Sequence, residues 1–402
     1  MPIQKNGLHK LFSHSTKPDF INAITLSDGD RDFLKQARIE VEEAIVDGFK
    51  VLRERGQWSK QDLPTPKFAM QGSWVYKTMN TPAHPPAQQL DIDVGLYMPF
   101  SSLGNGQQPA KATSAYFDVV DDILETFICT SHPDWTLVKK GTCSRIEFPN
   151  GYMHLDLPLY AYPDSEEKRI EEAQMQDSAE LTKGLSVNRF AVDARFLEQV
   201  TPTTIHMAHR EEGWKSSDAQ IIKSWVSSSI REKGHGNSVR QVCRLLKAWR
   251  DEQWPSGGGP SSIFLLAFTI REYQHTDSKI DVLLGRVIDQ LPLAYTKALT
   301  IPCPKPEDKR AMEDLRDRVP DPGERERNKI AFVNLRARYA QAKQASSPEV
   351  SNSILIELFG VRFPLDPSRI VMDTPEESIA KVVTASPARP VANRTMSETK
   401  AG

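Results

Sequence analysis

The chain has 402 residues, 39% of them hydrophobic, and a formal net charge of −2 at pH 7. This length allows two domains or one large bilobal unit, and the near-neutral charge argues against a globally basic nucleic-acid-binding protein. No apolar run is long enough to span a bilayer, Met1 to Ser15 contain no signal-peptide core, and the four cysteines form no CxxC pair. We therefore expect a cytoplasmic protein with reduced thiols and no membrane partner.

The first half of the chain alternates helices and strands. Residues 28–55 place apolar side chains at helical spacing, between a capping Ser27 and Gly56, and predict a long amphipathic helix. A second such helix is expected at residues 112–129, and a short one should begin at Ser73. Strands are expected at residues 67–70, 90–99, 135–148 and 152–162.

The second half reads as mainly helical. Helices are expected at residues 218–230, 238–254 and 261–273. The charged residues 166–180 are expected to be helical or exposed, and the proline-rich, charged residues 302–326 to form a surface excursion. The sequence therefore predicts an α+β, bilobal fold in which a mixed sheet is joined to a helical lobe, with a cleft between them. We divide it into an N-terminal segment (1–60), an α/β core (61–203), a helical lobe (204–365) and a flexible C-terminal tail (366–402).

Three aspartates are the candidate metal ligands. Asp91 and Asp93 are two residues apart on a predicted strand, so both carboxylates project from one face and repel each other unless a cation lies between them. Asp156 alternates with apolar neighbours on another predicted strand. Each aspartate alone also fits a solvent-facing position, but a mixed sheet could bring the three together. Such a set would bind Mg²⁺ for phosphoryl chemistry.

Candidate phosphate ligands follow two chain reversals. Gly72 lets the backbone approach a phosphate, and Ser73 would meet it at a helix N-terminus; Gly-Ser also ends many ordinary strands. Ser261 and Ser262 start a later helix in the same way.

A basic stripe offers a second set of phosphate ligands. Arg240, Arg244 and Lys247 share one face of a predicted helix. The stripe could face the cleft and grip a triphosphate, or it could be a solvated surface.

Two ring side chains lie near these residues. Tyr76, one helical turn after Ser73, could stack on a purine or simply pack in the core. His154 shares the strand face of Asp156, and we interpret it as a hydrogen-bonded structural residue rather than a base. The other histidines show no zinc-ligand spacing.

Several of these segments resemble the bacterial CD-NTases, the nucleotidyltransferase family that includes animal cyclic GMP-AMP synthase and the oligoadenylate synthetases. The similarity is greatest to the DncV-type 3′,3′-cyclic GMP-AMP synthases. It is carried by QGSWVYKTMN (71–80), LDIDVGLYMP (90–99), GTCSRIEF (141–148), HLDLPLYAYP (154–163), VCRLLKAWRDEQW (242–254) and GGGPSSI (257–263).

The resemblance implies a polymerase-β-like nucleotidyltransferase core and a set of site residues. Asp91, Asp93 and Asp156 would be catalytic and hold two Mg²⁺ ions, with Mn²⁺ as a possible substitute. Ser73, Lys247 and Ser262 would contact the triphosphate, Tyr76 would stack on a base, and Arg145 and Asp218 would select bases. The full set of implied nucleotide-binding residues is Gln71, Gly72, Ser73, Tyr76, Arg145, Ser217, Asp218, Lys247, Ser261 and Ser262.

The resemblance also implies a function and partners. ATP and GTP would be joined into 3′,3′-cyclic GMP-AMP, with release of pyrophosphate, as a second messenger in anti-phage (CBASS) signalling. The alternatives are a cyclase with another product, a non-cyclising nucleotidyltransferase, or an inert scaffold. The zinc insertion of the animal DNA-sensing enzyme is missing, so DNA is not an expected partner. The tail ends at Gly402, which a ubiquitin-transfer-like E1/E2 partner would join to a target; the alternative is an ordinary frayed terminus.

Overall fold

One mixed sheet forms the α/β part of the molecule in the computed structural model, which describes residues 6–57, 59–60, 63–103, 113–166, 200, 205–216, 219–275, 277–303 and 312–372. The strand order is β1-β2-β5-β4-β3, with β6 paired to β5 and β7 to β6. Only β2 and β5 run parallel among these pairs. The strands are β1 Lys67–Gln71, β2 Leu90–Pro99, β3 Thr136–Lys139, β4 Cys143–Glu147, β5 Met153–Tyr162, β6 His206–His209 and β7 Gly213–Ser216.

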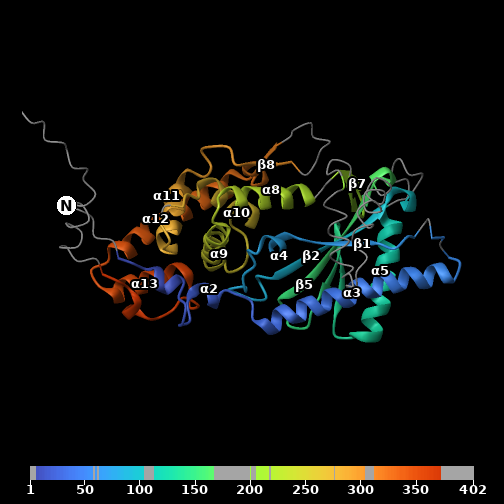
Figure 1. Ribbon diagram of the computed structural model, residues 1–402, viewed down its shortest axis with the longest axis horizontal. Helices are drawn as coiled ribbons and strands as arrows, with labels where there is room; N and C mark the ends of the chain where they lie inside the picture. The colour runs from blue at the N-terminus through green and yellow to red at the C-terminus, as the bar shows by residue number, and fades with distance from the viewer. Residues whose placement is uncertain are drawn as a thin grey trace, which may run out of the picture.

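Two long helices cover one face of this sheet (Figure 1). They are α3 (Asp28–Glu54) and α5 (Thr113–Ser131), and their apolar stripes share a core with the inward side chains of β2 and β5. The Ser27 hydroxyl accepts a hydrogen bond from the amide of Asp30 and so caps α3 as predicted. Because alternate side chains of a strand point to opposite faces, the other face is left for the polar residues of β2 and β5.

The helical lobe lies beside that second face (Figure 1). Its core contains Trp249, Phe264, Phe268 and Phe332. The short helix α4 (Gly72–Tyr76) connects β1 to the boundary between the lobes. The helices of the lobe are α8 Ala219–Glu232, α9 Gly236–Gln253, α10 Ser262–Glu272, α11 Ile280–Gln290, α12 Pro322–Gln344 and α13 Pro348–Phe359, with the 3-10 turns η3 Leu291–Leu293, η5 Leu315–Arg318 and η6 Pro367–Arg369.

The N-terminal segment is divided between the two cores. Its short helices α1 (His9–Phe12) and α2 (Phe20–Ala23) contribute to the helical lobe, where the Phe12 ring lies 5.5 Å from that of Phe359 and the Phe20 ring lies 5.0 Å from that of Phe363. The long helix α3 packs on the sheet instead. The described part of the N-terminal segment thus contributes side chains to both cores.

One strand prediction was wrong, and several short strands were not predicted. The single strand expected at residues 135–148 is an antiparallel pair, β3 and β4, because the polar residues between Lys139 and Cys143 reverse the chain. The expected surface segment at 302–326 contains β9 (Met312–Asp314), which pairs with β8 (Thr300–Pro302). The strands β6 and β7 are too short to give a clear alternating pattern and were not predicted.

Packing continues past the predicted start of the tail at residue 366. Arg369 is buried and donates a hydrogen bond of 2.6 Å to the carbonyl of Pro18, and Val371 pairs with Gly7. These contacts join positions more than 300 residues apart, so local composition does not reveal them. None of the described helices is both long and apolar enough to cross a membrane.

Candidate active site

Strand pairing brings the three predicted carboxylates onto one face of the sheet. In the parallel pair of β2 and β5, Asp91 is opposite His154 and Asp93 is opposite Asp156. Asp91 is exposed, whereas Asp93 and Asp156 are half-buried. The prediction that a mixed sheet would gather these residues is confirmed by this register.

Crowding of negative charge perturbs Asp93. Burial, followed by the charges of Asp91 and Asp156, raises the pKa of Asp93 from 3.8 to about 7, and Arg145 only partly offsets this. An arrangement of this kind is unfavourable without a counter-charge. A divalent cation would supply it, so the donor set fits the expected metal.

Arg145 is paired with the third carboxylate. It stands opposite Asp156 in the β4–β5 register, and its guanidinium donates from Nε to Oδ1 (2.7 Å) and from Nη2 to Oδ2 (2.8 Å). Its predicted contact with a nucleotide base stays a prediction. To contact a base, Arg145 would have to use donors that are not bonded to Asp156, or break one of its hydrogen bonds to that carboxylate.

The turn from β1 into α4 passes very close to Asp93. Gly72 has a φ of +64°, and a Cβ atom built on it would lie 2.2 Å from Asp93 Oδ2. The carboxylate therefore requires glycine at this position. Gln71 is a predicted nucleotide-binding residue, but its side chain is buried. Its Nε2 donates to the Tyr97 hydroxyl (2.8 Å), and its Oε1 accepts from the Tyr160 hydroxyl (3.2 Å).

A cavity of about 480 Å³ lies between the sheet and the helical lobe. On one side it is lined by Asp91 and Asp93, which we call the acidic wall, and on the other by Lys247 and Arg250 of α9, the basic wall. Gly72, Ser73, Tyr76, Trp254 and Ser262 also line it.

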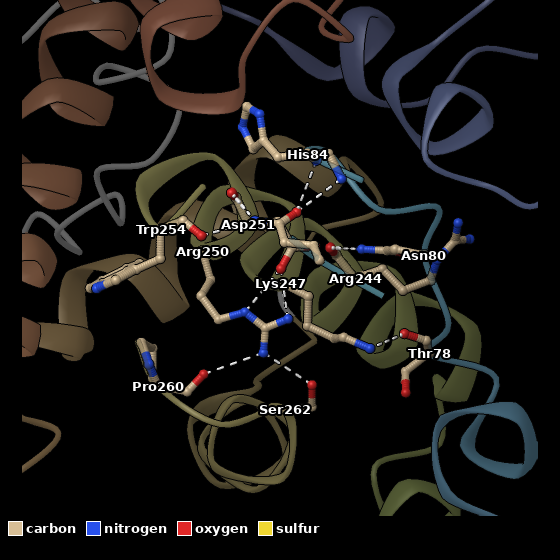
Figure 2. Close-up of polar contacts among 12 residues, drawn as sticks. Thr78, Asn80, His84, Arg244, Lys247, Arg250, Asp251, Trp254, Pro260 and Ser262 are labelled. Carbon is tan, nitrogen blue, oxygen red and sulfur yellow. Dashed lines mark hydrogen bonds and ion pairs between the residues drawn. The ribbon is translucent and has the colours of Figure 1, made fainter. Parts of the chain in front are cut away.

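Lys247 is the one member of the predicted basic stripe that faces this cavity in the described part of the chain. It is buried, its Nζ donates to the carbonyl of Thr78 at 2.8 Å (Figure 2), and burial lowers its pKa. Arg240 donates to the carbonyl of Tyr76, and Arg244 donates to the Asn80 side chain. Both line a different cavity, so neither alternative considered for the stripe, a cleft-facing surface or a solvated one, describes all three residues.

Arg250 was missed by the sequence analysis. Its guanidinium donates to Asp251 Oδ1 (2.6 and 3.0 Å) and to the Ser262 hydroxyl (3.0 Å), as Figure 2 shows. Its spacing of three residues from Lys247 places it on the same helix face and could have revealed it. Ser262 lines the cavity as predicted, whereas the Ser261 hydroxyl accepts from the amide of Phe264 and caps α10.

Tyr76 lines the cavity and also packs against the helical core. Burial, with a further contribution from Asp93, raises the pKa of Tyr76 to about 12, so the phenol stays protonated. Both predicted roles, stacking and packing, are compatible with this position. Ser217, Asp218 and Gly402 lie outside the described residues, and their roles stay predictions.

A mixed sheet with gathered carboxylates, a Gly-Ser turn at their edge and a helical lobe across the cavity define the nucleotidyltransferase class of fold. Two family models match the chain: the nucleotidyltransferase domain of the DncV-like cyclic GMP-AMP synthases over residues 66–160, and the C-terminal domain of cyclic GMP-AMP synthase over residues 236–371. The chain belongs to this DncV-type family of CD-NTases.

Curated relatives and solved structures agree with this assignment. The chain is 32% identical to a cyclic GMP-AMP synthase of Escherichia coli (strain TW11681) over 246 residues, which are 59% of this chain and 55% of that protein. A Vibrio cholerae serotype O1 cyclic GMP-AMP synthase is 32% identical over 247 residues, with the same two shares. The match thus spans about half the length of these relatives.

The fold is shared with Vibrio cholerae DncV. A mutant of that di-nucleotide cyclase in complex with ATP, GTP and 5MTHFGLU2 has a TM-score of 0.73 and 23% identity. A complex of the same protein with the linear intermediate 5′ pppA(3′,5′)pG has a TM-score of 0.72 and 23% identity. Each comparison covers 92% of this chain and 100% of the other.

Proposed function

We propose that the protein is a cyclic dinucleotide synthase that joins ATP and GTP into 3′,3′-cyclic GMP-AMP. The observation that carries this proposal is a single cavity lined by the acidic wall, the basic wall and the Gly72-Ser73 turn. A triphosphate between the walls would have its terminal phosphates near Lys247 and Arg250 and its α-phosphate near Asp91 and Asp93. Family membership and the names of the relatives support the choice of product.

Asp91, Asp93 and Asp156 would hold two Mg²⁺ ions, for which Mn²⁺ could substitute. When bound, these cations would neutralise the transferring phosphate and favour the alkoxide form of the attacking hydroxyl. The raised pKa of Asp93 supports a cation there, because the carboxylate lacks a sufficient counter-charge without one.

The remaining residues would position the substrate. Ser73 and Ser262 would contact phosphate oxygens, and Tyr76 would stack on a base. Arg145, Ser217 and Asp218 would select the bases. In each of two rounds a 3′-hydroxyl oxygen would form a bond to an α-phosphorus, the bond to the β-phosphate would break, and pyrophosphate would leave. The second round would close the ring.

One assay separates this proposal from its alternatives. The full chain is incubated with all four NTPs and Mg²⁺, and the products are identified by mass spectrometry. We expect a cyclic product with one adenine and one guanine, since larger purine faces stack better on Tyr76. Linear products alone would indicate a non-cyclising nucleotidyltransferase, robust synthesis from pyrimidine NTPs alone would refute the purine preference, and no product would favour the inert scaffold.

We further propose that the product is a second messenger in anti-phage defence in the cytoplasm. We also propose that a ubiquitin-transfer-like E1/E2 partner joins Gly402 to a target. The motivation is the family likeness. Deleting Gly402 should leave the NTP assay unchanged and eliminate any higher-mass conjugate in cells that express the partner enzymes. Persistence of that conjugate would show that the attachment point lies elsewhere.

A further inference from the structure

His154 is a buried imidazole with unused nitrogens. It lies on β5 directly opposite Asp91, and its side chain is on the cavity-facing side of the sheet with Asp156. Only 2% of it is exposed, and within the described residues neither Nδ1 nor Nε2 has a hydrogen-bond partner. The prediction that His154 is a hydrogen-bonded structural residue was therefore wrong. Leaving a buried polar group without a partner is unfavourable, so a ligand for the ring would remove that penalty.

A ligand position exists beside the ring. One donor atom each from Asp91, His154 and Asp156 lie within 4.8 Å of one another. Two carboxylate oxygens and an imidazole nitrogen at this separation can close on one cation with small side-chain movements. Asp91 belongs both to this group and to the acidic wall, so a single carboxylate would bridge two cation positions.

The two positions differ in their chemistry. The acidic wall offers oxygen ligands alone, which suits Mg²⁺. The second group adds an imidazole nitrogen, a ligand that first-row divalent transition-metal ions accept more readily than the hard, oxygen-preferring Mg²⁺ does. Arg145 already spans both oxygens of Asp156, so a cation there must share this carboxylate through its remaining lone pairs. Because Arg145 and the cation would compete for the Asp156 carboxylate, an ion that binds this carboxylate weakly is disfavoured.

We propose that Asp91, His154 and Asp156 form a nitrogen-containing cation position that takes a divalent transition-metal ion, with Mn²⁺ as its probe, in preference to Mg²⁺. The inference deepens the proposed function, on which it rests for the role of the bound metal. It assigns the two cations of the site different ligand sets and different selectivities.

The test uses the full chain, without nucleotide, and Mn²⁺ as the paramagnetic probe. Binding is followed by the loss of the free Mn²⁺ electron paramagnetic resonance signal, and nitrogen ligation by pulsed measurements on protein carrying ¹⁵N-labelled histidine. In the wild type we expect a histidine-nitrogen coupling to bound Mn²⁺ and displacement of this ion only by a large excess of Mg²⁺. His154→Gln should abolish the coupling and weaken Mn²⁺ binding roughly tenfold or more. It should also reduce the difference in binding affinity between Mn²⁺ and Mg²⁺.

His84→Gln is the matched control. Among the described histidines, His84 lies between the cavity-lining Pro82 and Ala87, but it does not belong to the group of Asp91, His154 and Asp156, and its Nε2 lies 3.3 Å from Glu252 instead, so this variant should keep both the coupling and the affinity. Absence of coupling in the wild type, or its survival in His154→Gln, would overturn the inference. The wild-type spectrum decides the matter even if His154→Gln does not fold. Product formation without any nitrogen coupling would reject this cation position and leave the proposed function intact.

Discussion

The acidic and basic walls of the cavity are built in opposite ways. The acidic wall comes from the regular register of β2, and its electrostatics are unfavourable by themselves, as the raised pKa of Asp93 shows. The basic wall comes from α9, and its cations already have partners: Lys247 has the carbonyl of Thr78, and Arg250 has Asp251 and Ser262.

Because the acidic wall lacks counter-charges and the basic wall has hydrogen-bond partners, substitutions in the two walls should affect activity and stability differently. Neutralising a carboxylate of the acidic wall removes repulsion, so it should cost activity without costing the fold. Removing a cation of the basic wall leaves a carbonyl or carboxylate without its donor, so it should cost both. The predictions below test this contrast from the largest expected effect to the smallest.

Asp91→Asn combined with Asp93→Asn should abolish product formation while the protein stays folded. The double variant removes ligands from the proposed cations, whose contribution to the transition state is several kcal/mol. A loss on the order of a thousandfold or more is expected. Mass spectrometry of NTP products and thermal unfolding measure the two effects. Activity near that of the wild type would remove the acidic wall from the active site.

The contribution of Asp93 to the stability of the metal-free protein should become less favourable as pH rises from about 4 to about 7, against the smaller opposite contributions of His154 and His9, whose pKa values are lowered by burial. The pKa of Asp93 is higher in the folded state than its ordinary 3.8, so in this window the folded protein binds more protons than the unfolded chain. The destabilisation is complete above about pH 7 and amounts to roughly 2–4 kcal/mol. Urea unfolding in the presence of EDTA at pH 4 and pH 8 measures it.

Asp93→Asn is the control for this pH dependence. It should gain stability relative to the wild type at pH 8 but not at pH 4, because an amide does not ionise. An equal difference at both values would mean that Asp93 ionises normally in the folded protein.

Lys247→Ala and Arg244→Ala form a matched pair on one helix, three residues apart. Losing the Lys247 contact with a triphosphate should raise the KM for NTP by about 10- to 150-fold, since a charge-assisted contact is worth about 1.5–3 kcal/mol. Arg244 itself lines a different cavity and bonds Thr25 and Asn80, of which only Asn80 also lines the active-site cavity, so its loss should lower thermal stability and raise KM far less than the loss of Lys247. Equal effects of both variants on KM would show that the stripe acts as a general positive surface.

The sequence predicts the acidic wall far better than the basic one, and the reason is physical. A strand has a period of two, so the spacing of Asp91 and Asp93 alone places both carboxylates on one face. The helical period correctly grouped Arg240, Arg244 and Lys247, but it contains no information on which neighbour each cation meets. The carbonyl of Tyr76 and the side chain of Asn80, more than 160 residues away, determine that outcome.

The same limit applies to His154. Its place on the face of Asp156 follows from strand alternation, but whether its nitrogens have partners depends on the packing of neighbouring strands. The extra turn between β3 and β4 was missed for a different reason. The turn between Lys139 and Cys143 is only a few residues long, so it hardly disturbs the alternating strand pattern of residues 135–148 in a single sequence.

Packing of the first helices against the last ones has a consequence for biosynthesis. Phe12 and Phe20 have Phe359 and Phe363 as ring partners in the helical lobe. A ribosome that adds about 5–20 residues per second needs roughly 20 to 70 s between making the two halves of this aromatic cluster. Throughout that interval the nascent chain displays apolar rings near its N-terminus with no native surface to cover them. A chaperone that binds nascent chains would find its site there, and the lobe can complete this part of its core only after Phe359 and Phe363 have been made.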